Sequence, residues 1–174
     1  WGRGDSGQLG LGPTDQVDVP TRVGSADNWS QVSVGELHTC ATRTDGSLWC
    51  WGRYPAKLPP WPEEPQQIGS ELDWDHVSSG ALSTCAVKDG GSLWCWGSQH
   101  NGAVGIGPTP PNAVEAPTRV GTSNDWTAVS VGPTHGCGTQ SDGSLWCWGE
   151  NRDGQLGNGR AWFVSPQPVS PVSP

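Results

Sequence analysis

The sequence has no methionine, only one tyrosine and one phenylalanine, and no long run of apolar residues. About 20 consecutive apolar residues are needed for a helix to cross a bilayer, so we expect no membrane insertion. Because methionine is missing even at residue 1, we expect a chain that has been processed or trimmed from a longer one.

Positive charge is scarce. Nine Lys and Arg residues stand against 17 acidic residues, which gives a formal net charge of -8, and the basic residues form no run. Nucleic acids and anionic membrane surfaces are bound through clustered Lys and Arg. The composition therefore predicts neither of these partners.

Glycine, proline and tryptophan are abundant instead. The 174 residues include 26 Gly, 16 Pro and 12 Trp, and only 33% of them are hydrophobic. Gly and Pro are the least favourable residues in a helix interior, so the composition favours an all-β protein. The excess of Trp over the other aromatics indicates that one Trp-containing unit has been repeated.

The repeat is visible in the segment "SLWCWG", which occurs at 47–52, 92–97 and 144–149. Its period is about 50 residues, which suits a four-stranded propeller blade better than a shorter helical or leucine-rich unit. Before it come "PTRVG" (20–24, 117–121) and "WSQVSVG" (29–35) or "WTAVSVG" (126–132), with weaker versions in the middle copy. Val32 and Val34 alternate with polar residues, as is typical of a half-buried strand. We predict four short antiparallel strands per period.

A glycine-rich connection occurs three times, as "WGRGDSGQLGLG" (1–12), "WGSQHNGAVGIG" (96–107) and "WGENRDGQLGNG" (148–159). Together with "VSVG" and "DGSLWCWG", these segments resemble the repeat of the regulator of chromosome condensation superfamily, in the Trp- and Cys-rich style of secreted bacterial members. The resemblance covers essentially the whole chain and implies a β-propeller, commonly seven-bladed. Relatives with this repeat include a nucleotide-exchange factor on chromatin and an inhibitor of β-lactamase, which implies recognition of proteins.

The chain is too short for a seven-bladed ring, which would need about twice its length. We expect an incomplete ring of about three blades with partial ends, either a fragment or an arc completed by other copies or a partner. The expected parts are the tail of a preceding blade with a connection (1–18), blade 1 (19–52), a connection with blade 2 (53–97), a connection with blade 3 (98–149), and a connection with a partial blade and a Pro-rich end (150–174).

Six cysteines form three pairs, each ten residues apart across a turn: Cys40 and Cys50, Cys85 and Cys95, Cys137 and Cys147. If the glycine of each turn is left-handed, the two cysteines lie opposite each other on neighbouring strands. Opposed Cα atoms about 4.5 to 5.5 Å apart can be bridged. We predict three disulfides within blades, which are typical of extracellular or periplasmic proteins.

Two other roles for these cysteines remain open, as reduced packing residues or as metal ligands. His38 and His135 each precede a cysteine by two residues, but the middle copy has Ser83 there and no fourth ligand recurs. A redox centre is not predicted, because the Cys-x-x-Cys spacing is absent. No metal site or cofactor is therefore expected.

The repeat becomes irregular at 51–62, "WGRYPAKLPPWP", where the glycines are lost. Tyr and Trp anchor many interfaces. We therefore predict a binding edge made of Tyr54, Lys57, Leu58 and Trp61. The alternative is a stiff crossing in which these side chains only fill space.

Enzymatic motifs are missing: we find no Walker loop, nucleophile elbow or zinc-binding helix motif. His76 and His100 recur at no equivalent position, and Asp73 and Asp75 are better explained as polar neighbours of a buried Trp. We predict a non-enzymatic, extracellular protein-interaction or scaffolding propeller with a protein partner or other copies as ligand, and no small molecule. The alternatives are a building block of an extracellular assembly and a propeller-scaffold hydrolase or lyase.

Overall fold

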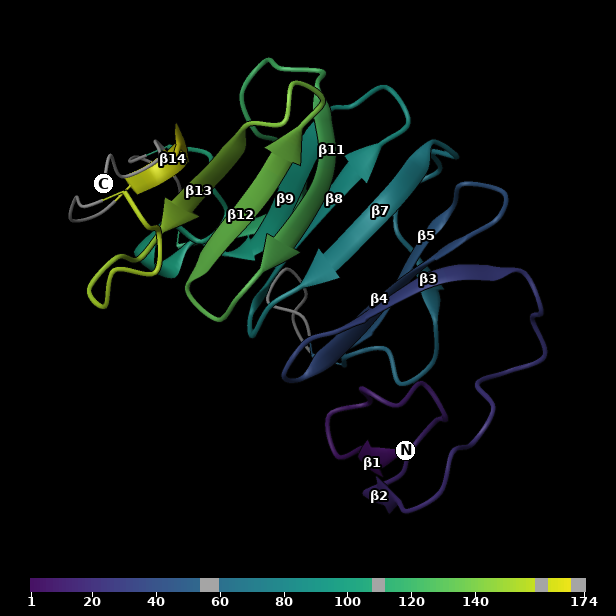
Figure 1. Ribbon diagram of the computed structural model, residues 1–174. Coiled ribbons are helices and arrows are strands. Elements are labelled where there is room, and N and C mark those ends of the chain that lie inside the picture. Colours follow the sequence, from purple (N-terminus) through teal and green to yellow (C-terminus); the bar gives the residue numbers. More distant parts are fainter. Residues whose placement is uncertain (54–59, 108–111, 159–162, 170–174) are drawn as a thin grey trace.

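The computed structural model describes residues 1–53, 60–107, 112–158 and 163–169, without the side chains of 163–165. Its main feature is three four-stranded antiparallel sheets that follow one another as adjacent blades (Figure 1). The first contains β3 (Trp29–Val34), β4 (His38–Arg43), β5 (Leu48–Gly52) and β6 (Gln66–Gln67). The second contains β7 (Trp74–Ser79), β8 (Ser83–Lys88), β9 (Leu93–Ser98) and β10 (Ala113–Arg119). The third contains β11 (Trp126–Val131), β12 (His135–Gln140), β13 (Leu145–Gly149) and β14 (Phe163–Pro168).

A two-stranded sheet of β1 (Gly2–Arg3) and β2 (Gln16–Val17) lies beside the first blade, and a short 3-10 helix, η1 (His100–Gly102), lies in a connection. The predictions of an all-β fold and of four-stranded blades are confirmed. No described helix is long and apolar enough to cross a membrane.

The outermost strand of each sheet comes from beyond the next connection. Gln67 in β6 pairs with Trp49, and Thr118 in β10 pairs with Cys95. The predicted ranges 53–97 and 98–149 therefore assign these strands to the wrong sheets. After each connection the chain pairs with the free edge of the strand it has just left, so the next blade begins only at the following Trp.

The central hairpins match the sequence prediction and show why "DGSLW" recurs. Gly46 has φ +78°, a left-handed conformation that glycine adopts without strain. Asp45 accepts bonds from the hydroxyl of Ser47 (2.6 Å) and its backbone N–H (3.0 Å), and these bonds lower the pKa of the carboxyl. The Ser47 hydroxyl in turn accepts the indole N–H of Trp49 at 2.8 Å. The side chains of Asp45, Ser47 and Trp49 thus close the turn.

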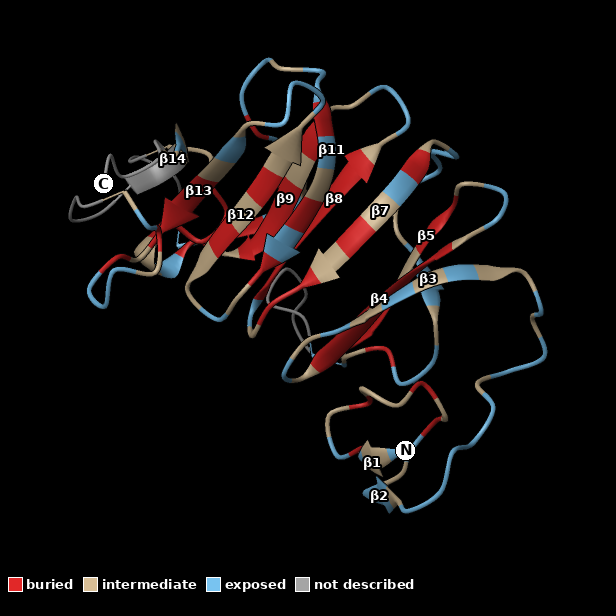
Figure 2. Cartoon of the chain, viewed as in Figure 1, coloured by how far each residue is buried: buried red, intermediate tan, exposed pale blue. Residues whose placement is uncertain are grey.

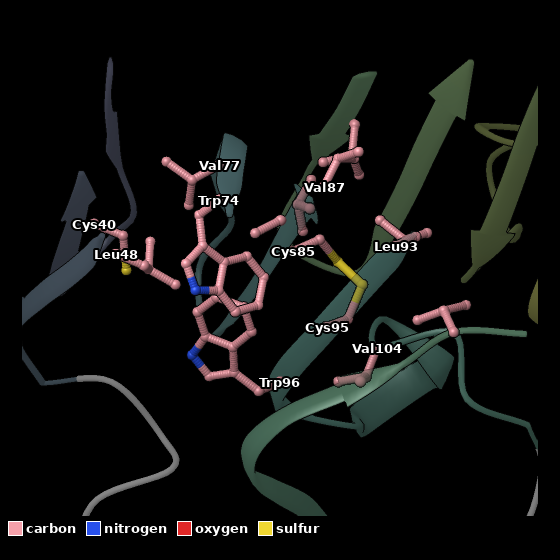
Figure 3. Close-up of a cluster of buried hydrophobic side chains, with 14 of the residues drawn as sticks. Cys40, Leu48, Trp74, Val77, Cys85, Val87, Leu93, Cys95, Trp96 and Val104 are labelled. Atoms are coloured by element: carbon pink, nitrogen blue, oxygen red, sulfur yellow. A yellow bond between two sulfur atoms is a disulfide. The ribbon is translucent and has the colours of Figure 1, made fainter. Parts of the chain in front are cut away.

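Each blade contains a cluster of three tryptophans that are buried or half-buried. Trp74 packs edge-on against Trp94 and Trp96, with ring centroids 6.3 and 6.4 Å apart. Edge-to-face contacts of this kind are favourable beyond the area they bury. The first and third blades repeat the arrangement around Trp29 and Trp126. Figure 3 shows Trp74 and Trp96 beside the Cys85–Cys95 disulfide.

The middle blade is the best covered, because it has a neighbour on both faces. In its innermost strand, β7, the side chains of Trp74, Val77 and Ser79 are buried, whereas the equivalent strand β3 alternates between half-buried and exposed (Figure 2). The strand predicted from Val32 and Val34 is present, but both valines are exposed rather than buried. The side of β3 that carries them has no blade packed on it among the described residues.

Candidate functional site

The first joint between blades is polar and buried. The imidazole Nε2 of His38 in β4 lies 2.8 Å from the hydroxyl oxygen of Thr84 in β8, and both side chains are buried. The backbone N–H of Ser79 in β7 donates to the hydroxyl of Ser33 in β3 at 2.8 Å. These bonds connect the two inner strands of one sheet to the two inner strands of the next.

The second joint repeats the serine contact, because Val131 N–H donates to the Ser78 hydroxyl at 2.9 Å. It adds His76, whose Nε2 lies 3.0 Å from the carbonyl oxygen of Val129 and whose Nδ1 lies 3.0 Å from the amide nitrogen of Gln31. His76 thus links all three blades through their innermost strands. Sequence reasoning found no partner for it, because its partners lie far away along the chain.

Burial lowers the pKa of His38 to about 4. The ring is therefore neutral at pH 7 and acts as a hydrogen-bonding group of the joint. Across the ranges that the structure describes, no group of three His, Cys, Asp or Glu side chains could hold a metal ion. The position of His38, two residues before Cys40, is explained by its contact with the next blade.

All six cysteines form disulfides within blades. Cys40–Cys50, Cys85–Cys95 and Cys137–Cys147 are each joined across the hairpin, with Cα atoms 4.1 Å apart and the two residues directly opposite in the register. No cysteine is free. The reduced and metal-ligand alternatives therefore do not apply to this structure.

Of the four residues predicted to form a binding edge, only Trp61 lies among the described residues. Tyr54, Lys57 and Leu58 lie outside them. The Arg53 guanidinium carbon stands 4.9 Å from the centre of the Trp61 ring, a cation–π distance. Trp61 is half-buried.

Trp61 lines a pocket of about 600 Å³ that the sequence did not predict. Two connections far apart in sequence form it, since the N–H of Gly12 donates to the carbonyl of Glu63 at 3.0 Å. Its walls combine prolines with the exposed Glu63 and Glu64. The pocket thus combines an aromatic ring and prolines with two carboxylates.

A second hollow of about 430 Å³ lies between the outer parts of the first and second blades. Lys88 lies over the rings of Trp74 and Trp94, at 4.6 and 5.0 Å, and pairs with Asp73 at 2.9 Å. The Lys88 ammonium group therefore already contacts two rings and a carboxylate of its own blade. The expectation that Asp73 is a polar neighbour of a buried Trp is confirmed, because Trp74 is buried.

Comparison with known proteins gives a consistent family. The model of the regulator of chromosome condensation (RCC1) repeat matches residues 1–42, 90–138 and 142–173, and a second model of this repeat matches 74–103 and 126–155. The ultraviolet-B receptor UVR8 of Arabidopsis thaliana is 43% identical over 58 residues, which are 31% of this chain and 13% of the receptor.

Solved structures agree with the fold. Human WBSCR16 superposes with a TM-score of 0.82 at 24% identity, over 97% of this chain and 47% of its own. Yeast RCC1 (Prp20), crystallised with Kap60, gives a TM-score of 0.82 at 18% identity, over 98% of this chain and 44% of its own. The chain thus spans less than half of these structures, and the likeness is one of fold.

Proposed function

Because the chain belongs to the RCC1 repeat family, we propose that it is a non-enzymatic, extracellular interaction scaffold that binds a protein partner. The observation that carries this proposal is the pocket at the half-buried Trp61, which an indole, several prolines and two carboxylates from two connections line. Propeller blades present their connections on a common face, so such an edge is available to a macromolecule.

Two of the similar structures support a protein partner. One is yeast RCC1 bound to Kap60, and the other describes binding of yeast Prp20p to Gsp1p and histones. For this chain the chemistry of the pocket indicates which kind of protein segment would bind there. Glu63 and Glu64 favour a basic segment, and the Trp61 ring favours an apolar or cationic side chain beside it.

We assign Tyr54, Lys57 and Leu58 to this same edge as part of the proposal, on the basis of their sequence position between Arg53 and Trp61. Tyr and Trp provide large contact areas at a low cost in conformational entropy. The proposed interface therefore consists of the irregular connection and the two glutamates that follow it.

An extracellular or periplasmic location is supported by the three disulfides. Disulfides persist where the environment is oxidising and are rare in the cytosol. The acidic net charge of -8 also suits a secreted binder more than a chromatin protein. We propose secretion on these two grounds.

A second candidate function, a building block completed by another chain, is supported by the exposed valines of β3. It needs a partner that covers a blade face instead of a connection. This candidate and the Trp61 edge are compatible, because they use different surfaces.

The test is a binding screen of the oxidised full chain against a library of secreted proteins and basic peptides, followed by two variants. Trp61→Ala should weaken a selected partner by about tenfold or more, as for an aromatic anchor. Trp1→Ala is the matched control, because Trp1 is 72% exposed and does not line the pocket. Equal binding by wild type and Trp61→Ala, for every selected partner, would contradict the proposal.

A further inference from the structure

In each of the first two blades, a cationic side chain lies over a pair of tryptophan rings. The guanidinium carbon of Arg43 lies 4.4 Å from the ring centre of Trp29 and 3.8 Å from that of Trp49. The Lys88 ammonium lies over two rings of the second blade in the same way. All four distances are within the roughly 6 Å over which a cation is attracted to an aromatic ring. Each of these blades therefore supplies a cation to its own tryptophans.

The third blade has the same pair of rings and a neutral residue at the position of the cation. The ring centroids of Trp126 and Trp146 are 6.3 Å apart, the same distance as in the second blade. In the first two blades the cation is the cross-strand partner of the innermost tryptophan, whereas Trp126 pairs with Gln140. The Gln140 amide donates to the hydroxyl of Ser123 at 3.3 Å. Among the described residues, no Lys or Arg side chain lies over either ring.

The carboxylate that pairs with the Lys88 ammonium also has a counterpart in the third blade. Asp73, directly before the innermost tryptophan, pairs with Lys88 at 2.9 Å. Asp125 directly precedes Trp126 in the same way, is exposed, and forms no ion pair with another described residue. The third blade therefore keeps the two rings and the carboxylate that hold an ammonium group in the second, with Gln140 in place of Lys88.

A pocket of about 390 Å³ leads to these rings. Trp126, Gln140 and the half-buried Trp146 line it, together with the segment 119–123 of the preceding blade joint. The hollow of about 430 Å³ beside Lys88 is its counterpart in the second blade. Because both lie between the outer strand of one blade and the tryptophans of the next, the pocket is a recurring feature of the blade joint. Its volume is enough for a short alkyl chain.

One cation, Arg119, lines the pocket, but its guanidinium is engaged elsewhere. It donates to oxygens of the loop 122–124, at 2.6 to 3.4 Å. The first blade shows that such an arginine is compatible with a second cation on the rings. Arg22 of the equivalent segment "PTRVG" donates to the carbonyls of residues 25 and 26, and Arg43 still lies over its two tryptophans.

We propose that the third blade binds a primary alkylammonium group in this pocket, with its charge over Trp126 and Trp146 and beside Asp125. The group takes the position that the side chain of Lys88 has in the second blade. Its source is either a lysine side chain of a protein or a free amine, because both present the same group. This site is separate from the pocket at Trp61 and does not depend on it.

The probes are butylammonium, for a free amine, and Nα-acetyl-lysine amide, for a protein side chain. Each is titrated into the isotope-labelled, oxidised full chain, and the indole N–H signals are followed by NMR. We expect saturable shifts at Trp126 and Trp146 with a dissociation constant on the order of 10 mM, since a single cation–π site is weak. Butanol and Nα-acetyl-norleucine amide, which lack the charge, should bind about fivefold more weakly or less. Tighter binding of one ammonium probe identifies the source.

Two reciprocal substitutions test the assignment. Gln140→Lys gives the third blade the cation of the second, so the tryptophans of the third blade should no longer respond to the probes. Lys88→Gln does the reverse, so the tryptophans of the second blade should begin to respond. Both variants copy an arrangement that already exists in another blade of this chain, at the same place in the register.

Three results would overturn the inference: no saturable shift in the wild type, equal shifts from the neutral compounds, or an unchanged response in Gln140→Lys. Trp61→Ala should leave the response unchanged, because Trp61 does not line this pocket. A chain that binds the ammonium probes but no partner at Trp61 would overturn only the proposed function. A partner lost in Trp61→Ala, without any response to the probes, would overturn only the present inference.

Discussion

His38 belongs to the first blade, yet its imidazole bonds the hydroxyl of Thr84 in the second, 46 residues further along the chain. Both groups are shielded from water, so the bond has no competing solvent partner. A buried polar contact of this kind sets the angle and register of two sheets more strictly than apolar packing alone. The blades are therefore joined by specific hydrogen bonds as well as by hydrophobic contact.

Lowering the pH should destabilise the contact between His38 and Thr84. The pKa of His38 is about 4 in the folded chain and about 6.5 when exposed, so between these values the unfolded chain binds a proton that the folded chain excludes. The free energy of unfolding should fall as the pH drops from 6.5 to 4, by roughly 3 kcal/mol from this group.

Chemical denaturation across this pH range measures the effect. The variant His38→Ser, which copies Ser83 of the middle blade, should lose this part of the pH dependence. An unchanged pH dependence in His38→Ser would show that His38 is not the group responsible.

The buried hydroxyl of Thr84 should contribute more to the free energy of unfolding than an exposed hydroxyl does. Thr84→Val leaves the buried imidazole without its partner, and we expect a loss of about 1 to 3 kcal/mol in unfolding free energy. Thr127→Val is the matched control, because Thr127 bonds Thr139 at an exposed position and should cost about 0.5 kcal/mol or less. Equal losses in the two variants, measured by denaturant titration, would argue against a special role for the joint.

Each disulfide should stabilise its own hairpin. The paired cysteines are ten residues apart, and the chain-entropy relation gives about 2 to 3 kcal/mol for so short a loop. The double variant Cys85→Ala and Cys95→Ala should lower the unfolding free energy by up to this amount. Peptide mapping of the oxidised wild type should pair each cysteine with the one opposite it, and a crosslink between blades would refute the assignment.

Gly105 should not tolerate a side chain. It has φ +74°, and a methyl group there would lie 2.9 Å from the ring of Trp148, whose indole N–H donates to Ala103. Gly105→Ala should therefore lower the free energy of unfolding by more than about 1 kcal/mol, because the backbone is strained and the Trp148 ring is displaced. Gly90→Ala is the control, because nothing lies within 4 Å of its added carbon and its φ is not left-handed. Thermal unfolding of both variants checks the difference.

Local signals predicted the hairpins. The two cysteines face each other because the spacing around a left-handed glycine fixes the register, and both facts are contained within about a dozen residues. The clusters of three tryptophans follow from the same repeat. Alternation also predicted β3, but it did not show which side of that strand would be covered, since this depends on the neighbouring blade.

Contacts between segments far apart in the chain could not be predicted from the sequence. The outermost strands were assigned to the following blade, because a short strand has the same pattern at either sheet edge. His38 was considered as a metal ligand, since its cysteine neighbour is two residues away whereas Thr84 is in the next repeat. The pocket around Trp61 was missed for the same reason, because Gly12 and Glu63 come from different connections.

The most direct measurement of the interaction-scaffold account compares the affinity of a selected partner for the wild type and for Trp61→Ala. The account predicts that Trp61→Ala weakens binding by about tenfold or more, because Trp61 lines the proposed binding pocket, and that Trp1→Ala leaves binding unchanged. Equal affinity of wild type and Trp61→Ala for every selected partner would contradict the account.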